Sequence, residues 1–121
     1  MSPELYMGQA LGRALIVEDN VLLNCLLQEM VQTLGFSVSG VITSADAREA
    51  ISRGDFDLML TDLNLDQGSS GLMLAREAML ANRTLRVVIA SGLPVPEELE
   101  SNIGFLQKPF TVGQLRNAIQ A

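Results

Sequence analysis

Short apolar runs alternate along this chain with longer segments whose apolar residues recur at helical spacing. A short continuous apolar run is typical of a strand buried on both faces, whereas apolar residues three and four positions apart mark one face of a helix. Strands are predicted at residues 14–17, 36–41, 57–62, 86–90 and 103–107. Such alternation favours a parallel sheet with helices on both faces, joined by right-handed crossovers. The predicted fold is therefore α/β, a doubly wound sheet of five parallel strands.

The run Phe36–Val41 differs from the other four because polar residues stand at alternate positions in its first half. A period of two is expected of a strand with one face in water. This run is therefore predicted to lie at an edge of the sheet.

Helices are predicted between these strands. The first follows a cap at Asp19 or Asn20 and stops at Gly35, the second is capped by Ser44, and the third covers residues 71–81. The last begins after Thr111, which forms a capping box with Gln114. The residues predicted to form the buried face of the first helix are Leu23, Leu26, Leu27, Met30 and Leu34.

The connection between the fourth and fifth strands, residues 92–102, is unusually short. It has eleven residues and contains Pro94 and Pro96. A crossover between parallel strands needs about a dozen residues or more, and proline disfavours helix in the first half of the segment. The fourth helix is therefore predicted to be short or missing, with at best one or two turns over Glu97–Ser101.

Length and composition limit the class of protein. The 121 residues suffice for one domain, and we expect a tail at residues 1–12 and a folded domain at residues 13–121. The net charge of −6 argues against nucleic-acid binding through this domain. A single cysteine, Cys25, and the absence of histidine exclude an internal disulfide, a cysteine metal cluster and histidine-based chemistry. No apolar run is long enough to span a membrane, and residues 1–12 lack the pattern of a signal peptide, so we expect a cytoplasmic protein.

Polar residues follow the predicted strands where parallel strands share one edge of the sheet. Glu18-Asp19 follow the first strand, and Asp62 ends the third with Asn64 two positions on. Ser91-Gly92 follow the fourth strand and Lys108-Pro109 the fifth. Because open α/β sheets bind their ligands at the carboxyl ends of the strands, these side chains are expected to meet.

The chemistry of this set points to phosphoryl transfer. Three carboxylates repel one another unless a cation neutralises them, and oxygen ligands without histidine or cysteine favour Mg²⁺. The Lys108 ammonium can bind an anion such as phosphate, and the Ser91 hydroxyl can donate to the same anion. We therefore expect transfer of a phosphoryl group onto Asp62, with Mg²⁺ and Lys108 balancing the charge.

The pattern of Glu18-Asp19, Asp62, Ser91, Phe105 and Lys108-Pro109 resembles the receiver (CheY-like) domain of two-component response regulators, over about residues 13–121. The resemblance implies a flavodoxin-like sheet. It also implies that Asp62 is the phosphoacceptor, that Lys108 and Ser91 contact the phosphate, and that Phe105 is a switch aromatic. In such a domain the Mg²⁺ ligands would be Glu18, Asp19, Asp62 and the backbone carbonyl of Asn64, and the Lys108-Pro109 bond would be cis.

The resemblance implies a switch in a phosphorelay and not a metabolic enzyme. Its only chemistry would be self-phosphorylation and slow autodephosphorylation at Asp62. The phosphodonor would be a sensor histidine kinase or a histidine phosphotransfer protein, and the output would be an unidentified protein contact. Receiver domains often dimerise near the fourth helix, so a homodimer is a candidate assembly, although the shortened segment 92–102 argues against carrying that role over.

Three departures from the family pattern concern the site. The acidic pair is Glu-Asp instead of two aspartates, and Ser91 replaces the commoner threonine. The loop Leu65–Ser70 lacks the usual proline and is one residue longer, so its path near the metal is not predicted.

Simpler explanations exist for each motif alone. Glu18 and Asp19 could begin a helix, Asp62 could be a turn residue, and Lys108 could be an exposed lysine before a turn proline. Two other functions stay open for the whole set. One is a small Mg²⁺-dependent phosphatase with an aspartate nucleophile, against which the amide at Asn64 counts. The other is an interaction module that works without phosphorylation.

Overall fold

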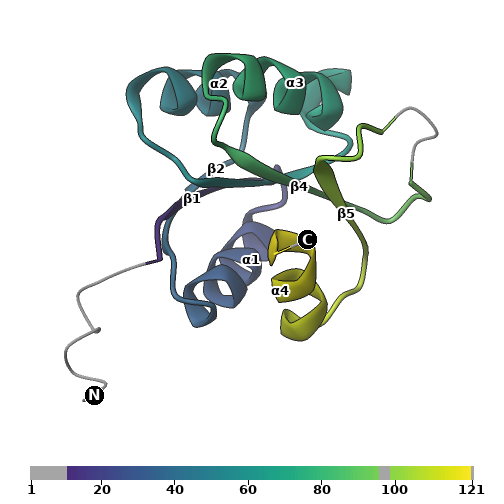
Figure 1. Cartoon of the computed structure of the whole chain (residues 1–121). Coiled ribbons are helices and arrows are strands. Elements are labelled where there is room, and N and C mark those ends of the chain that lie inside the picture. The colour runs from purple at the N-terminus through teal and green to yellow at the C-terminus, as the bar shows by residue number, and fades with distance from the viewer. Residues whose placement is uncertain (1–10, 96–98, 121) are drawn as a thin grey trace.

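A sheet of five parallel strands forms the middle layer of the structure, a computed structural model that describes residues 11–95 and 99–120 (Figure 1). The strands are β1 (Arg13–Val17), β2 (Ser37–Val41), β3 (Leu58–Asp62), β4 (Arg86–Ser91) and β5 (Ile103–Gln107). Their order is β2-β1-β3-β4-β5, and every neighbouring pair is parallel. The predicted doubly wound parallel sheet is confirmed, with β2 at one edge.

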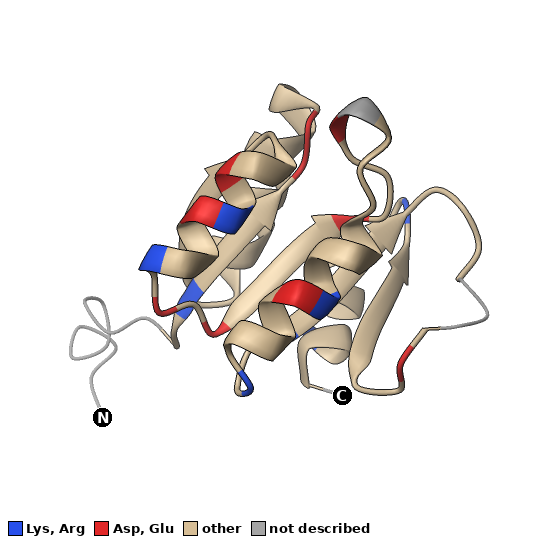
Figure 2. Cartoon of the chain, turned by 90° about the horizontal axis from the view of Figure 1, so that it is seen from above, with Lys and Arg blue, Asp and Glu red and all other residues tan. Residues whose placement is uncertain are grey.

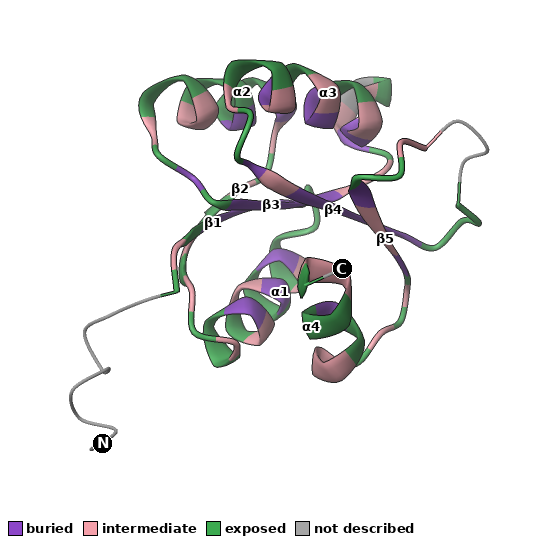
Figure 3. Ribbon diagram, in the orientation of Figure 1, coloured by how far each residue is buried: buried purple, intermediate pink, exposed green. Residues whose placement is uncertain are grey.

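Helices cover both faces of this sheet. Figure 1 shows α1 (Val21–Thr33) and α4 (Val112–Gln120) on one face, and α2 (Ser44–Arg53) and α3 (Gly71–Ala81) on the other. Each face has its own apolar cluster, one centred on Met59 and Leu74 beneath α2 and α3, the other on Leu60 and Leu115 beneath α1 and α4. The colours of Figure 3 show the same layering, with buried strands between helices whose outer faces are exposed.

The runs that read as continuously apolar are the central strands. Residues 14–17 of β1, 58–61 of β3 and 87–91 of β4 are all buried. Helices shield both faces of these strands, so neither face needs a polar residue. The sequence of β2, in contrast, alternates because this edge strand is largely exposed.

Most of the predicted helix caps are present. The Asn20 side chain accepts a hydrogen bond from the Leu23 amide, and Thr111 and Gln114 form the expected reciprocal box. Gly35 follows α1 with φ of 106°, a left-handed conformation that favours glycine. The predicted cap residue of α2 was wrong by one position. The Thr43 hydroxyl accepts from the Asp46 amide, while Ser44 is the first residue of the helix and is buried.

The buried face of α1 differs from the predicted stripe. Leu26 is 52% exposed, whereas Leu27, Val31 and the polar residue Asn24 are buried. The prediction for Leu26 is therefore wrong. The helix is rotated so that positions 24, 27 and 31 face the sheet, because Asn24 finds hydrogen-bond partners there.

Opposite charges join the helices that cover the second face. Seen from above in Figure 2, acidic and basic segments lie side by side on α2 and α3. Arg48 of α2 and Glu77 of α3 form an ion pair of 2.8 Å between Nε and Oε2. Both side chains are about half exposed, so the pair fixes neighbouring helices but contributes little to stability.

The connection between β4 and β5 has no helix in its described parts, residues 92–95 and 99–102, which agrees with the prediction of a short or missing fourth helix. The turn considered over Glu97–Ser101 lies partly outside the described residues. Leu99 packs against the apolar cluster under α3. Glu100 accepts hydrogen bonds from Arg76 of α3, with Nη2 to Oε1 at 2.8 Å and Nε to Oε2 at 3.0 Å.

Residues 1–10 of the expected tail lie outside the described residues. Leu11 donates its amide hydrogen to the Gly35 carbonyl, and Gly12 accepts from the Ser37 amide, so both pair with the segment that leads into β2. In the part of the chain that the structure describes, no helix has the length and apolar character to cross a bilayer.

Candidate functional site

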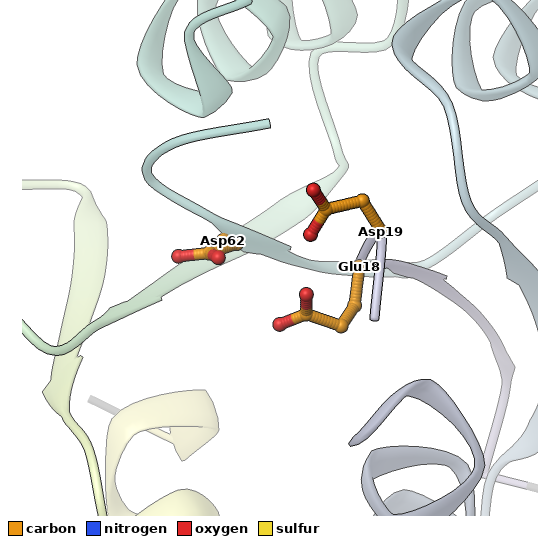
Figure 4. A group of neighbouring side chains, drawn as sticks. All are labelled: Glu18, Asp19 and Asp62. Atoms are coloured by element: carbon orange, nitrogen blue, oxygen red, sulfur yellow. The ribbon is translucent and has the colours of Figure 1, made fainter. Parts of the chain in front are cut away.

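Three carboxylates meet where β1 and β3 end. Glu18 and Asp19 directly follow β1, and Asp62 is the last residue of β3 (Figure 4). Each contributes an oxygen atom to a group in which all the oxygens lie within 4.8 Å of one another. The register explains the meeting, because Val17 is paired with Thr61 and the next residues of both strands therefore lie side by side.

Glu18 is the buried member of this group, with 2% of its surface exposed. Its Oε1 accepts a hydrogen bond of 2.9 Å from Lys108 Nζ, and its Oε2 accepts one of 3.1 Å from the Asn20 amide. Burial raises the pKa of the Glu18 carboxyl above its ordinary value, and the hydrogen bonds from Lys108 and Asn20 partly offset that rise.

Lys108 connects β5 to this group. Its Nζ lies 3.5 Å from Asp62 Oδ2, farther than from Glu18, and its backbone amide donates to the Ser91 carbonyl over 2.8 Å. The bond between Lys108 and Pro109 is cis, as expected. The ammonium group therefore lies between the buried Glu18 and the more accessible Asp62.

The charges around this group suit a hard divalent cation. Three carboxylates face one ammonium group, which leaves an excess negative charge at the sheet edge. The donors are oxygen atoms only, the ligand type that Mg²⁺ and Ca²⁺ prefer. The residues present thus fit a metal ion of this class.

Ser91 directly follows Ala90, the residue of β4 that is paired with Asp62, whereas Phe105 lies one strand farther away on β5. The Ser91 side chain is buried, and its hydroxyl oxygen accepts the Leu93 amide over 3.0 Å. Phe105 is opposite Ile89 in the register and packs against the apolar cluster under α3. Because side chains alternate along β4, Ser91 and Ile89 lie on the same face of the sheet. Phe105 is paired with Ile89, so Ser91 and Phe105 are diagonal neighbours on that face.

The loop after Asp62 follows a fixed path. Asn64 is exposed and forms an antiparallel bridge with Ser70, and a short 3₁₀ turn, η2 (Asp66–Gly68), lies between them. Asp66 Oδ1 accepts the Ser44 amide over 3.0 Å, which ties the loop to the beginning of α2. The longer loop is thus accommodated by the 3₁₀ turn and anchored to a neighbouring helix.

Gly71, the first residue of α3, is one of the residues that the sequence did not single out. A Cβ atom at this position would overlap the Asp62 carbonyl oxygen. Asn24 is another, since it is a buried amide beside Glu18. The sequence signals for these two residues were weak. Gly71 is a glycine after a Ser-Ser pair, and Asn24 is a polar residue among the leucines of α1.

Known proteins share this fold and sequence pattern. The family profile described as "Response regulator receiver domain" matches residues 14–120. The swarming motility regulation protein RssB of Serratia marcescens is 32% identical over 112 residues, which cover 88% of this chain and 51% of RssB. This chain therefore spans about half the length of that relative.

Two solved structures are similar along almost the whole chain. A response regulator receiver protein from Sinorhizobium medicae WSM419 has a TM-score of 0.83 and 28% identity, covering 93% of both chains. A CheY-like receiver domain from Methylobacillus flagellatus has a TM-score of 0.81 and 31% identity, covering 92% of this chain and 98% of the other. With the profile match, these likenesses show that the chain belongs to the receiver domain family of two-component response regulators.

Proposed function

We propose that Asp62 is the phosphoacceptor of this receiver domain and that its phosphorylation switches a protein contact. The observation that supports this most directly is the place of Asp62 at the carboxyl end of β3. There it has an ammonium group 3.5 Å away and two more carboxylates beside it. In the reaction, an Asp62 oxygen attacks phosphorus, the bond between phosphorus and the donor's imidazole nitrogen breaks, and an acyl phosphate forms while histidine leaves.

Mg²⁺ is the proposed cofactor, held by Glu18, Asp19, Asp62 and the backbone carbonyl of Asn64. When bound, the ion neutralises the charge of the transferred phosphoryl group. Lys108 supplies the second positive charge, because its ammonium already lies within reach of Asp62. Asp62 is half-buried, so its carboxylate is open to a donor at the sheet edge.

Ser91 and Phe105 are the proposed readout of the phosphorylated state. The Ser91 hydroxyl accepts the Leu93 amide and keeps its own hydrogen available as a donor. Donation to a phosphoryl oxygen would draw Ser91 towards Asp62 and would free space next to Phe105. The segment after Ser91 would then change its arrangement, and a partner protein would detect the change.

The proposed donor is a phosphohistidine on a sensor histidine kinase or a histidine phosphotransfer protein, because this chain has no histidine of its own. The proposed extent of the receiver domain is residues 13–121. The output lies in a separate protein or in a part of the protein beyond this sequence.

The decisive experiment is to treat the protein with acetyl phosphate and Mg²⁺ and to follow its intact mass. We expect a gain of one phosphoryl group that hydroxylamine removes and that Asp62→Asn abolishes. Labelling of Asp62→Asn to the wild-type level would contradict the assignment. Sustained turnover of a simple phosphate ester would instead indicate a phosphatase.

A further inference from the structure

We propose that Asn24 is a positioning residue for the metal-binding carboxylates, because its buried side-chain amide fixes the backbone that carries Glu18 and Asp19. The inference rests on the proposed function of the site. It adds a residue of α1 that touches neither the phosphoryl group nor the metal and acts through the backbone of its neighbours.

The contacts of Asn24 are specific. Its side chain is 3% exposed, and Nδ2 donates to the Glu18 carbonyl over 2.9 Å and to the Val41 carbonyl over 2.8 Å. Its Oδ1 in turn accepts Gln28 Nε2 over 2.7 Å. Both hydrogens and the oxygen of the amide are therefore in use, and the chain of bonds runs from the surface of α1 to the ends of β1 and β2.

Asn24 adds a second connection between the backbone of Glu18 and the end of β2. The Glu18 amide donates to the Val41 carbonyl over 3.2 Å, and that same carbonyl accepts from Asn24. The Glu18 carboxylate is held separately, by Lys108 and the Asn20 amide. A shift of the Glu18 backbone would therefore move the carboxylates of Glu18 and Asp19 relative to Asp62.

Gly40 in β2 supplies the space that the Asn24 amide needs. A Cβ atom at Gly40 would overlap Asn24 Oδ1 and Gln28 Nε2. The backbone of Gly40 is not in a left-handed conformation, so the requirement is for space and not for flexibility. Gly40 thus gives a second way to disturb the amide without changing α1.

The expected size of the effect follows from other metal sites. Replacing a residue that orients a ligand typically weakens metal affinity by about 10- to 100-fold. In Asn24→Leu, a side chain of similar size without donors, the Glu18 carbonyl loses its amide partner in a buried place. We expect the Kd for Mg²⁺ to rise about tenfold or more.

The test compares Mg²⁺ titrations followed by amide NMR shifts for the wild type, Asn24→Leu, Gly40→Ala and Val31→Ala. Val31 is a fully buried residue of the same helix, so Val31→Ala is a matched control for loss of α1 packing. All titrations are made well below the melting temperature of the least stable variant. A readout without metal is hydrogen exchange of the Glu18 amide, which should quicken more in Asn24→Leu and Gly40→Ala than in Val31→Ala, where only the loss of global stability contributes.

The outcomes separate this inference from the proposed function. Weaker Mg²⁺ binding in Asn24→Leu and Gly40→Ala, with Val31→Ala within twofold of the wild type, supports the positioning role. Equal binding in Asn24→Leu and Val31→Ala overturns it while the proposed function stands. Wild-type protein that neither binds Mg²⁺ nor accepts phosphate overturns both. If Asn24→Leu does not fold, Gly40→Ala decides the question alone.

Discussion

Gly71 shows how closely the backbone approaches the candidate phosphoacceptor. Its amide donates to the Leu63 carbonyl over 2.7 Å, and a methyl group in place of its hydrogen would overlap the Asp62 carbonyl. We expect Gly71→Ala to lower the free energy of unfolding by about 1–3 kcal/mol, as overpacking does elsewhere. Urea denaturation measures the loss.

Gly113→Ala in α4 is the matched control. A Cβ at this position meets only Thr111 Oγ1, at an ordinary 3.7 Å. Since alanine favours helix over glycine, its stability should be unchanged or higher by up to about 1 kcal/mol. Equal stability of the two variants would show that α3 can move away from Asp62 without lowering the free energy of unfolding.

Replacing Lys108 should change the affinity for Mg²⁺ and the rate of phosphorylation in opposite directions. Its ammonium lies 2.9 Å from Glu18 and 3.5 Å from Asp62, so Lys108→Ala removes a positive charge that competes with Mg²⁺. We expect tighter Mg²⁺ binding by calorimetry. Phosphorylation by acetyl phosphate should slow by about 100-fold or more, because the transferred group loses a fixed charge partner.

Lys108→Arg is the companion variant, since it keeps the charge and changes the shape of the donor group. It should restore Mg²⁺ affinity to the wild-type value more fully than the rate of phosphorylation. Unchanged phosphorylation in Lys108→Ala would refute the proposed role.

The meeting of the three carboxylates could be predicted from the order of the strands and helices along the chain. Asp62, Glu18 and Asp19 meet because strands of equal length end at one edge, a consequence of the alternation of strands and helices. Asn24 could not be predicted, because its amide is satisfied by carbonyls of Glu18 and Val41, and Val41 is 17 positions away. Burial of a polar side chain depends on such distant partners.

At the scale of elements, the segment between β4 and β5 is fastened to α3 by Arg76 and Glu100. The Arg76 hydrogen bonds lower the pKa of the Glu100 carboxyl. A lowered pKa means that the pair stabilises the fold fully above the ordinary value of 4.5 and loses this effect as pH falls through the folded-state pKa. Glu100→Gln should therefore be less stable than the wild type at neutral pH, and the difference should close in acid.

Urea midpoints measured from neutral to acidic pH test this expectation. Glu49→Gln is a suitable comparison, because Glu49 pairs with Arg53 within α2 and both side chains are at least 60% exposed. The loss of stability in Glu49→Gln should be smaller than that in Glu100→Gln at neutral pH. A constant difference between Glu100→Gln and the wild type down to strongly acidic pH would count against the ion pair.

Element boundaries were predicted from the sequence more closely than element faces. The caps at Asn20 and Thr111 lie where expected because a cap is a local hydrogen bond. The rotation of α1 was wrong at Leu26, since a helix rich in leucine offers more than one apolar face. The choice between Thr43 and Ser44 as the α2 cap was also local but ambiguous, because both are hydroxyl residues.

For the molecule as a whole, the acidic site should couple metal binding to stability. A ligand that binds only the folded state stabilises it by about 2.7 kcal/mol at a concentration 100 times its Kd. We expect Mg²⁺ to raise the melting temperature by several degrees, and Asp19→Asn or Asp62→Asn to reduce the shift.

NaCl of equal ionic strength controls for screening, and Asp55→Asn, which changes an exposed acid before β3, should behave as the wild type. A shift that survives in Asp19→Asn and Asp62→Asn would place the metal elsewhere.

The architecture was predictable because the pattern is global. Buried runs such as Leu58–Thr61 can only be central strands if helices shield both faces, and short connections leave few topologies. The absence of a helix from the described residues of the β4–β5 connection, 92–95 and 99–102, agrees with a prediction made from its count of eleven residues. The path of this connection could not be predicted, because Arg76, which binds Glu100 of the connection, lies on the helix α3.

The short connection between β4 and β5 also offers an opportunity for protein engineering. Pro94 and Val95 are exposed and stand a few residues beyond Ser91, whose hydroxyl holds the Leu93 amide. Exposed connections with few anchors accept inserted sequences well. A circularly permuted fluorescent protein inserted between Pro94 and Val95 would be joined almost directly to the candidate switch residue. The chain could then serve as a sensor whose brightness follows the chemical state of Asp62.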